Sequence, residues 1–427
     1  MKKKYVVWSL VGLILASLVV SSCAPAEVEQ APESEAMEAE EEAAVEADEG
    51  AEAVAPEELV LGMLLVGPYN DRGWSQAHYD AGLYVEEKLP GVSMVYLDKV
   101  NVADRPGTTP AQLGEELVSK GATVVVFNSD DMKDSAHDFA LANPDIVTIH
   151  ASGDGNWQEG VNYKNIPNLA NVMGRMEYGK MIAGCAAALT SETGKIAYLG
   201  PLINEETRRL ASSAYLGAEY CWENYADKDA ADLTFEVKWI GFWFNIPGVT
   251  SDPTQVSDDF FNNDFDVVIS GIDTTEALVE AAKMKAEGKD VYAIPYDYKN
   301  ACEGADDVCL GVPYFNWGPA YVDTISAVMD GSFEPFYEWN SPDWTNINDE
   351  DSSAVGFTKG AALSADNSAL VDDFIAELAT GLNLWKGPLN LQDETQYLAE
   401  GETASDSQIW YLPQLLEGMV GLSTPAE

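Results

Sequence analysis

From residue 59 onward, short apolar runs alternate with segments whose apolar residues recur at helical spacing. The first run, residues 59–66, is rich in Leu and Val and too short to cross a membrane, so it predicts a buried strand. A polar loop at 67–74 follows, and a helical pattern then extends to Leu89. Repetition of this unit is typical of parallel sheets with helices on both faces. We therefore predict an α/β fold.

The alternation occurs in two sets, separated by a polar stretch at 153–169. A chain of 427 residues exceeds one average domain, so we expect a first lobe at 59–170 and a second at 171–297. Residues 298–427 are expected to return to the first lobe and to cross between the lobes. The further predicted strands are 92–96, 123–127, 146–150, 195–199, 233–240, 266–270, 291–294, 308–312 and 354–357. The further predicted helices are 111–120, 134–142, 173–189, 207–225, 253–261, 274–287, 318–329 and 368–380.

The N-terminal segment 1–23 has the layout of a lipoprotein signal peptide. Three lysines precede an apolar stretch, and small residues lead directly to Cys23, the expected lipidation site. A plain signal peptide or an N-terminal membrane helix is the alternative. Residues 24–58 contain 14 acidic residues and no Lys or Arg, so they predict a disordered, extended tether. We expect a chain lipid-anchored to the cell membrane on its extracytoplasmic face.

The net charge and the cysteines indicate which binding partners, disulfides and metal sites to expect. A formal net charge of −49 repels phosphate backbones, so nucleic acid is not an expected partner. Cys302 and Cys309 bracket a short loop and predict a local disulfide, whereas Cys185 and Cys221 fit either buried thiols or a second bridge. Neither a CxxC motif nor a nearby His accompanies them, so we expect no metal site.

Catalytic signatures are scarce. The sequence has no P-loop, GxGxxG, GxSxG or HExxH motif, and its three histidines are scattered. The acidic segment that begins at Asp130 lacks the Gly and Glu of an EF-hand and is typical of a helix start. We therefore expect neither enzyme activity nor a cofactor.

Polar and aromatic side chains gather where the predicted strands end. Ligands of open α/β sheets bind beyond the carboxyl ends of the strands. The loop after the first strand carries Asp71, Trp74 and Gln76 at that position. The other candidates are Asn128, Ser129, Trp243, Phe244, Asn245, Asp273, Asp297 and Asn316. Aromatic faces with amides and carboxylates suit a flat, polar, neutral or cationic small molecule, although each aromatic residue also fits a core or lobe-interface position.

An ordered set of motifs resembles the basic membrane protein family, the lipoprotein substrate-binding components of ABC importers that include a purine nucleoside receptor. The resemblance covers most of residues 59–427. Its motifs are 70–76 (NDRGWSQ), 175–179 (RMEYG), 193–196 (TGKI), 243–245 (WFN), 316–319 (NWGP) and 386–388 (KGP), together with the acids Asp273 and Asp297.

The resemblance implies a type I periplasmic-binding-protein fold, in which crossover strands form a hinge between two Rossmann-like lobes. It implies a purine nucleobase or nucleoside as ligand and an ABC permease as partner. Trp74 with Phe244 or Trp243 would sandwich the base. Asp71, Asn128 and Ser129 would meet its polar edges from the first lobe. Asp273 and Asp297 would approach from the second lobe or the hinge, with Asp297 at a ribose.

One departure from the family pattern bears on the ligand. Nucleoside-binding members carry a Lys shortly after the strand that corresponds to 308–312, and this chain has Tyr-Phe-Asn-Trp at 314–317. The departure favours a free base such as adenine over a nucleoside. Two alternatives differ in class: a ligand-sensing receptor lipoprotein for another small aromatic or sugar-like molecule, and a secreted enzyme acting on nucleosides.

Overall fold

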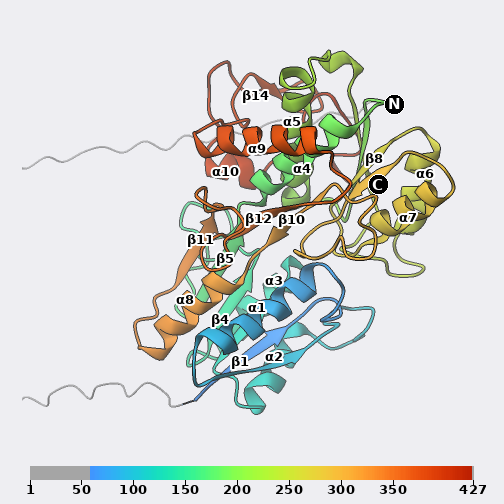
Figure 1. The fold of residues 1–427 in the computed structure, drawn as a ribbon. Coiled ribbons are helices and arrows are strands. Elements are labelled where there is room, and N and C mark those ends of the chain that lie inside the picture. The colour runs from blue at the N-terminus through green and yellow to red at the C-terminus, as the bar shows by residue number, and fades with distance from the viewer. Residues whose placement is uncertain (1–57, 426–427) are drawn as a thin grey trace, which may run out of the picture. The chain divides into compact units, whose positions relative to one another are not determined.

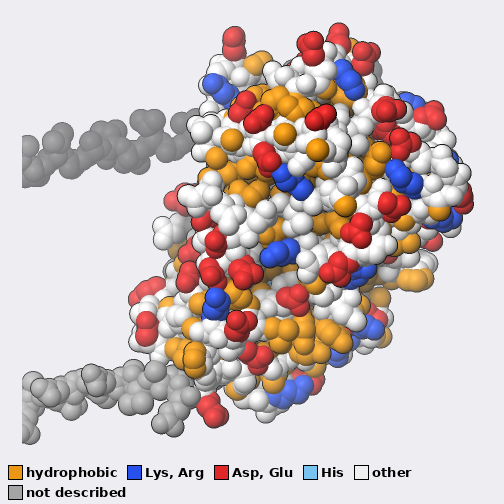
Figure 2. Space-filling model, viewed as in Figure 1, with side chains coloured by type: hydrophobic (Ala, Val, Ile, Leu, Met, Phe, Trp, Pro, Cys, Tyr) orange, Lys and Arg blue, Asp and Glu red, His pale blue; other side chains and the backbone are white. Residues whose placement is uncertain are grey.

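The computed structural model of the chain describes residues 58–425. The expected signal peptide, the lipidation site Cys23 and the tether up to residue 57 lie outside the described residues. Within 58–425, none of the helices has the length and apolarity needed to cross a membrane. Acidic side chains are spread over the face of the molecule shown in Figure 2, where basic side chains are fewer.

The first lobe is built on a six-stranded parallel sheet in the order β11-β5-β4-β3-β1-β2 (Figure 1). Apolar runs form its central strands, and every residue of β3 is buried. A capping box at Thr109 and a proline in the first turn start α2, as expected for a helix N-terminus. The strands are β1 (Leu59–Leu64), β2 (Val92–Leu97), β3 (Val124–Phe127), β4 (Val147–Ala151), β5 (Leu169–Gly174) and β11 (Phe336–Asn340). The helices of this region are α1 (Trp74–Lys88), α2 (Pro110–Ser119), α3 (Lys133–Ala142) and α8 (Gly318–Met329).

The second lobe is built on a five-stranded parallel sheet in the order β15-β7-β6-β8-β9. A capping box at Asn204 starts α5 just beyond the end of β6. The strands are β6 (Lys195–Gly200), β7 (Thr234–Trp239), β8 (Val267–Ser270), β9 (Tyr292–Ile294) and β15 (Met419–Val420). The helices are α4 (Met176–Thr190), α5 (Glu205–Asn224), α6 (Pro253–Asn262), α7 (Glu276–Ala286), α9 (Ala365–Ala379) and α10 (Asp406–Trp410). Two parallel sheets with helices confirm the predicted α/β class.

The chain passes between the two sheets three times: between β5 and β6, between β9 and β11, and between β11 and β15. The antiparallel pair β10 (Gly311–Phe315) and β12 (Val355–Lys359) lies on the second and third of these passages. A small hairpin, β13 (Leu389–Asn390) with β14 (Gln396–Leu398), follows in the C-terminal region. The C-terminal segment thus supplies one edge strand to each lobe.

Three sequence predictions are wrong in detail. The helix predicted at 173–189 begins at Met176, because the preceding residues form strand β5. The polar residue Asn171 interrupts the apolar run of that strand. Its side chain is buried and accepts a hydrogen bond of 2.8 Å from the Asn156 backbone. Strand β11 was not predicted, and the strand expected at 308–312 is β10, at Gly311–Phe315.

Both cysteine pairs are bonded. The Cys302–Cys309 bridge confirms the predicted local disulfide. Cys185 is bonded to Cys221, which joins α4 to α5 and decides between the two alternatives left open by the sequence.

Candidate ligand-binding site

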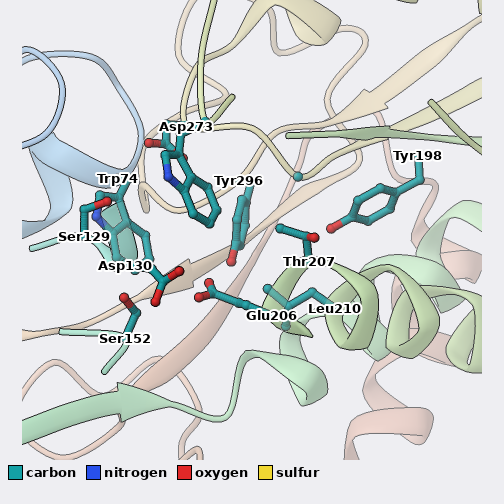
Figure 3. A pocket seen from close by; sticks show the side chains of 12 residues that line it. Trp74, Ser129, Asp130, Ser152, Tyr198, Glu206, Thr207, Leu210, Asp273 and Tyr296 are labelled. Atoms are coloured by element: carbon teal, nitrogen blue, oxygen red, sulfur yellow. The ribbon is translucent and has the colours of Figure 1, made fainter. Parts of the chain in front are cut away.

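A cavity lies beyond the carboxyl ends of strands from both sheets. Figure 3 shows side chains of the two lobes converging on it. The first lobe contributes Trp74, Ser129, Asp130 and Ser152. The second lobe contributes Tyr198, Glu206, Thr207, Leu210, Trp243, Gly271, Asp273 and Tyr296. Four of the residues singled out in the sequence therefore line one cavity: Trp74, Ser129, Trp243 and Asp273.

Asp71 organises the loop that carries Trp74. Its carboxylate accepts hydrogen bonds from the backbone N–H groups of Gly73 at 2.9 Å, Ser75 at 3.0 Å and Gln76 at 2.9 Å. These groups open helix α1, where an acidic side chain is favoured. Burial raises the pKa of Asp71 to about 6, and the three backbone bonds oppose that rise. The carboxylate is thus committed to the loop and does not line the cavity.

Trp74 is positioned by its own polar atom. Its indole Nε1 donates a hydrogen bond of 2.6 Å to the backbone oxygen of Asn128. Its ring meets Phe315 and Trp317 edge to face, at centroid distances of 5.3 and 5.2 Å. The side chain of Asn128 accepts a bond from the Val66 backbone at 2.9 Å, so it supports the sheet edge. A buried aromatic face is thereby held at the first-lobe wall.

Trp243 forms part of the second-lobe wall. Its backbone oxygen accepts a hydrogen bond of 2.9 Å from the Asp273 backbone N–H. Its indole Nε1 is buried and donates to no other group among the described residues. The neighbouring Phe244 instead packs edge to face on Phe242, at 5.0 Å between centroids. Asn245 accepts a bond of 3.1 Å from the Thr250 hydroxyl. Of the WFN motif, only Trp243 lines the cavity.

The remaining sequence candidates do not line the cavity. Gln76 Oε1 accepts a bond of 3.1 Å from the Arg72 backbone. Asn316 Nδ2 donates to the backbone oxygens of Glu350 at 3.0 Å and Ser353 at 2.8 Å. Asp297 is fully buried behind the lining, in a left-handed conformation with φ of 70°. Its carboxylate oxygens accept no hydrogen bond from the residues that the structure describes.

The second-lobe side of the cavity concentrates buried carboxyl groups. Burial raises the pKa of Glu206 to about 7. Burial also raises the pKa of Asp273 and of Asp297 well above the ordinary range, and the charges of Asp71 and Glu206 raise both further. Figure 3 shows the Glu206 and Asp130 carboxyl groups, from opposite lobes, directed toward the same part of the cavity. The site therefore concentrates carboxyl groups that retain their protons to a higher pH than exposed ones, and a protonated carboxyl group can both donate and accept hydrogen bonds.

A fully buried lysine, Lys180, lies next to these carboxyl groups in the second lobe. Lys180 on α4 donates a 2.7 Å hydrogen bond to the Ser270 backbone oxygen. Its Nζ lies 3.1 Å from the ring centroid of Tyr296, a cation–π contact. The Lys180 charge also opposes the rise in the pKa of Asp297. Lys180 thus joins the floor of the cavity to the core of the second lobe.

Sequence reasoning did not select several lining residues. Ser152, Gly271 and Tyr296 follow strand ends, so the rule that selected Trp74 applies to them as well. Glu206 lies in the first turn of α5, and its only sequence signal is an acidic helix start after a strand. Tyr198 lies inside β6, where nothing in the local sequence separates it from a core residue. Within 58–425, no group of three or more potential ligands is placed to hold a metal ion.

An aromatic and acidic cavity between two α/β lobes, with crossing strands between them, defines a two-lobed solute-binding protein. Residues 58–335 match the family described as Bmp, ABC transporter substrate-binding protein PnrA-like. The match spans well over half of the chain, which therefore belongs to this family of ABC transporter substrate-binding proteins. Such proteins work on the extracytoplasmic side of the membrane and bind solutes without a catalytic role.

Two relatives and one solved structure are similar to the chain. The purine-binding protein of Brucella abortus is 27% identical over 362 residues, which cover 84% of this chain and 91% of the relative. A Haloferax volcanii protein, named for glucose binding in an ABC transporter, is 24% identical over 64% of this chain and 62% of its own length. An ABC transporter solute-binding protein of Aeropyrum pernix K1 superposes with a TM-score of 0.59 at 12% identity, covering 78% of this chain and 93% of that chain. The predicted type I periplasmic-binding-protein fold is confirmed.

Proposed function

We propose that the protein captures a purine nucleobase or nucleoside between its lobes and delivers it to the permease of an ABC importer. The observation that carries this proposal is the presence of two tryptophans, Trp74 and Trp243, in the lining of one cavity from opposite lobes. Flat aromatic rings stack on indole faces and gain from the exclusion of water. The 27% identity to a relative named for purine binding points in the same direction.

The polar lining favours a ligand that brings hydrogen-bond donors. Asp130, Glu206 and Asp273 line the cavity as acceptors when ionised. A ring N–H or an exocyclic amine of a purine would satisfy such groups when they are ionised, and a ring nitrogen of the base would accept from a protonated one. Ser129 and Ser152 can both donate and accept at the first-lobe edge. We therefore favour an amino-bearing base, with adenine as the first candidate.

The tryptophans would stack on the base, and Asp273 and Ser129 would bond its edges. Three residues would act indirectly, without touching the ligand, because they hold the loop and the ring of Trp74: Asp71, Gln76 and Asn128. Phe244, Asn245 and Asn316 would support the walls. Asp297 would reach a ribose only if the cavity opened toward it, because its side chain is fully buried.

A ligand screen tests the proposal. Adenine, guanine, hypoxanthine, adenosine, guanosine and glucose would each be added to the purified chain, and the thermal unfolding midpoint measured. A ligand at 100 times its Kd stabilises the native state by about 2.7 kcal/mol, so a true ligand raises the midpoint. Calorimetric titration then gives the affinity. Absence of a shift with every purine would reject the purine assignment.

Glucose stands in the panel because the Haloferax relative is named for binding it. A shift with glucose alone would favour a sugar-binding protein. Chromatography of each mixture after prolonged incubation addresses the enzymatic alternative, since a nucleoside-acting enzyme would release product.

We further propose that Cys23 carries a lipid and that the acidic residues after it tether the lobes to the membrane. The small residues before Cys23 and the acid-rich composition of 24–57 support this layout. Mass spectrometry of the mature N-terminus tests it: the expected product begins at a diacylated Cys23, and the Cys23→Ala variant is found in the soluble fraction. An unmodified N-terminus at another residue would contradict it.

A further inference from the structure

Arg72 reaches from the first lobe to the second, outside the cavity. It lies in the loop between β1 and α1, and its Nη2 donates to three backbone oxygens of the turn that follows β9. The distances are 3.5 Å to Asn300, 3.3 Å to Ala301 and 2.5 Å to Glu303. A single guanidinium nitrogen has two hydrogens, so the three carbonyls share them. Charge-assisted bonds of this kind are stronger than neutral ones.

The conformation of the loop between β1 and α1 directs the Arg72 side chain toward the second lobe. Arg72 has a φ of 60°, a left-handed conformation that a residue other than glycine adopts only where its surroundings hold it. The Arg72 backbone N–H donates to Gln76 Oε1 at 3.1 Å. The Asp71 carboxylate binds the next backbone N–H, that of Gly73. Two residues of the NDRGWSQ motif that do not line the cavity therefore fix the orientation of Arg72.

The receiving turn is fixed by a disulfide. Cys302 lies between Ala301 and Glu303, two of the acceptors, and is bonded to Cys309. Ala301 and Cys309 are fully buried in the apolar core of the second lobe. The disulfide thus closes the turn at the point where its carbonyls converge on Arg72.

The lobes also touch at the next residue. A Cβ placed on Gly73 would lie 1.7 Å from the backbone oxygen of Asp273, so the two backbones meet there with no room for a side chain. Asp273 and the following residue of the loop, Trp74, line the cavity. Contact between the lobes at 72–73 therefore sets the distance between the two walls.

We propose that Arg72 is a latch that holds the two lobes together around the cavity. We further propose that the Cys302–Cys309 disulfide fixes the conformation of the turn whose backbone oxygens accept the hydrogen bonds of Arg72. The latch acts in the ligand-free protein, where no bound molecule bridges the two lobes. It extends the proposed function by adding an affinity-determining residue outside the cavity, and it does not depend on which ligand is bound.

Small-angle X-ray scattering of the ligand-free chain tests the latch. Arg72→Ala is expected to increase the radius of gyration, because the lobes separate, and Arg72→Lys to give an intermediate value. Arg105→Ala is the matched control: Arg105 is also half-buried, but it donates within its own lobe, to the Asp98 oxygen at 2.8 Å and the Lys99 oxygen at 3.2 Å. Its radius of gyration should equal that of the wild type. Equal values for Arg72→Ala and the wild type would overturn the proposal.

A double-mutant cycle tests the disulfide. Cys302→Ala/Cys309→Ala is expected to increase the radius of gyration when Arg72 is present and to add little when Arg72 is already Ala, because both changes disable one contact. Cys185→Ala/Cys221→Ala removes a bridge that lies elsewhere in the second lobe and should leave the radius unchanged. Circular dichroism confirms that each variant is folded. Additive increases would overturn the role assigned to the disulfide.

Adenine titration gives a second measurement. We expect Arg72→Ala to bind adenine about tenfold more weakly, chiefly through faster dissociation, given the strength of charge-assisted bonds. Arg105→Ala should bind as the wild type does. If the wild type does not bind adenine, the adenine assignment fails. The scattering of the ligand-free protein would still test whether Arg72 holds the lobes together.

Discussion

The indole Nε1 of Trp74 donates a 2.6 Å hydrogen bond to the backbone oxygen of Asn128. This bond joins the start of α1 to the residue that follows β3, the strand beside β1 in the sheet. It satisfies the polar atom of a buried indole and fixes the plane of the ring at the cavity wall. Asn128 thus acts on the cavity through Trp74, and its own amide oxygen accepts a hydrogen bond from the Val66 backbone.

Replacing Trp74 by Ala should weaken both the fold and binding. Loss of one stacking partner costs about 1–3 kcal/mol of affinity. Loss of a large buried side chain costs about 3 kcal/mol of stability. The measurement is the thermal midpoint with and without adenine. We expect a lower midpoint and a ligand-induced shift that is reduced or absent.

Trp157→Ala is the control for this prediction. Trp157 is as buried as Trp74, at 8% against 7% exposure, but it stacks on Tyr337 and Tyr411 outside the cavity. It should lower the midpoint and leave the ligand-induced shift intact. An undiminished shift in Trp74→Ala would show that this ring does not contact the ligand.

Ionisation of Glu206 should cost stability as the pH rises through the range in which Glu206 titrates. Burial raises the pKa of Glu206 to about 7 from an ordinary value of 4.5, so the native state retains a proton that the unfolded chain releases. The linkage therefore favours unfolding as the pH rises from about 4.5 to about 7, by up to about 3 kcal/mol. The raised pKa values of Asp71 and Asp273 act in the same direction.

Denaturant unfolding of the wild type and Glu206→Gln between pH 4.5 and 8 measures this effect. The Gln variant cannot ionise, so its stability should exceed that of the wild type by a margin that grows from pH 5 to pH 8. Glu205→Gln, which changes a more exposed neighbour in the same helical turn, should preserve the wild-type slope. The lowered pKa values of the buried His78 and His150 favour folding as the pH rises, so the margin between variant and wild type is the measure. A margin that stays constant from pH 5 to pH 8 would contradict the prediction.

Gly73→Ala should prevent the lobes from closing without unfolding them. The added Cβ would overlap the Asp273 backbone oxygen, and neither backbone can yield as a side chain would. We expect adenine affinity to fall at least tenfold, measured by calorimetry, with a nearly unchanged ligand-free midpoint.

Gly107→Ala serves as the comparison for Gly73. Gly107 has a φ of 80° and open space around its Cα, so alanine there costs about 1 kcal/mol of backbone strain and touches nothing. It should lower the midpoint slightly and leave affinity unchanged. Wild-type affinity in Gly73→Ala would refute the close approach of the two lobes.

The two disulfides should differ in their contribution to stability. In the loop-entropy model, a bridge that spans 36 residues contributes about 4 kcal/mol and one that spans 7 about 2 kcal/mol. Denaturant unfolding of Cys185→Ala/Cys221→Ala and Cys302→Ala/Cys309→Ala tests this order. A larger loss from the shorter bridge would indicate that Cys302–Cys309 acts mainly in the native state.

Local patterns in the sequence predicted most strands and helices but missed several elements, among them the paired strands β5 and β11. Strand β3 is a wholly apolar run and stands out locally. Strand β11 contains Glu338 and pairs with β5, so that Phe336 lies beside Ala170. A pairing between segments so far apart leaves no periodic trace in either segment, and a polar residue within each interrupts its apolar run. Such strands are recognised only when their partners are in place.

The candidate site likewise contains residues that the sequence predicted and residues that it did not. The strand-end rule found Trp74, Ser129, Trp243 and Asp273, which line the cavity. It also selected Asp71 and Asn316, whose polar atoms are already bonded to nearby backbone groups. No residue pattern indicates whether a side chain is already satisfied, because its partners come from segments that meet only on folding.

The sequence by itself determined the α/β class, the family and the strand ends where a ligand would bind, since periodicity and motif order are properties of the chain. Tertiary structure decided which of those side chains face the cavity, which cysteines are bonded, and that Glu206 and Tyr198 join Trp74 in one lining. It also brought Arg72 to a turn more than 200 residues away. The physical reason is that burial, hydrogen-bond satisfaction and the meeting of two lobes depend on contacts distant in sequence, which local spacing does not encode.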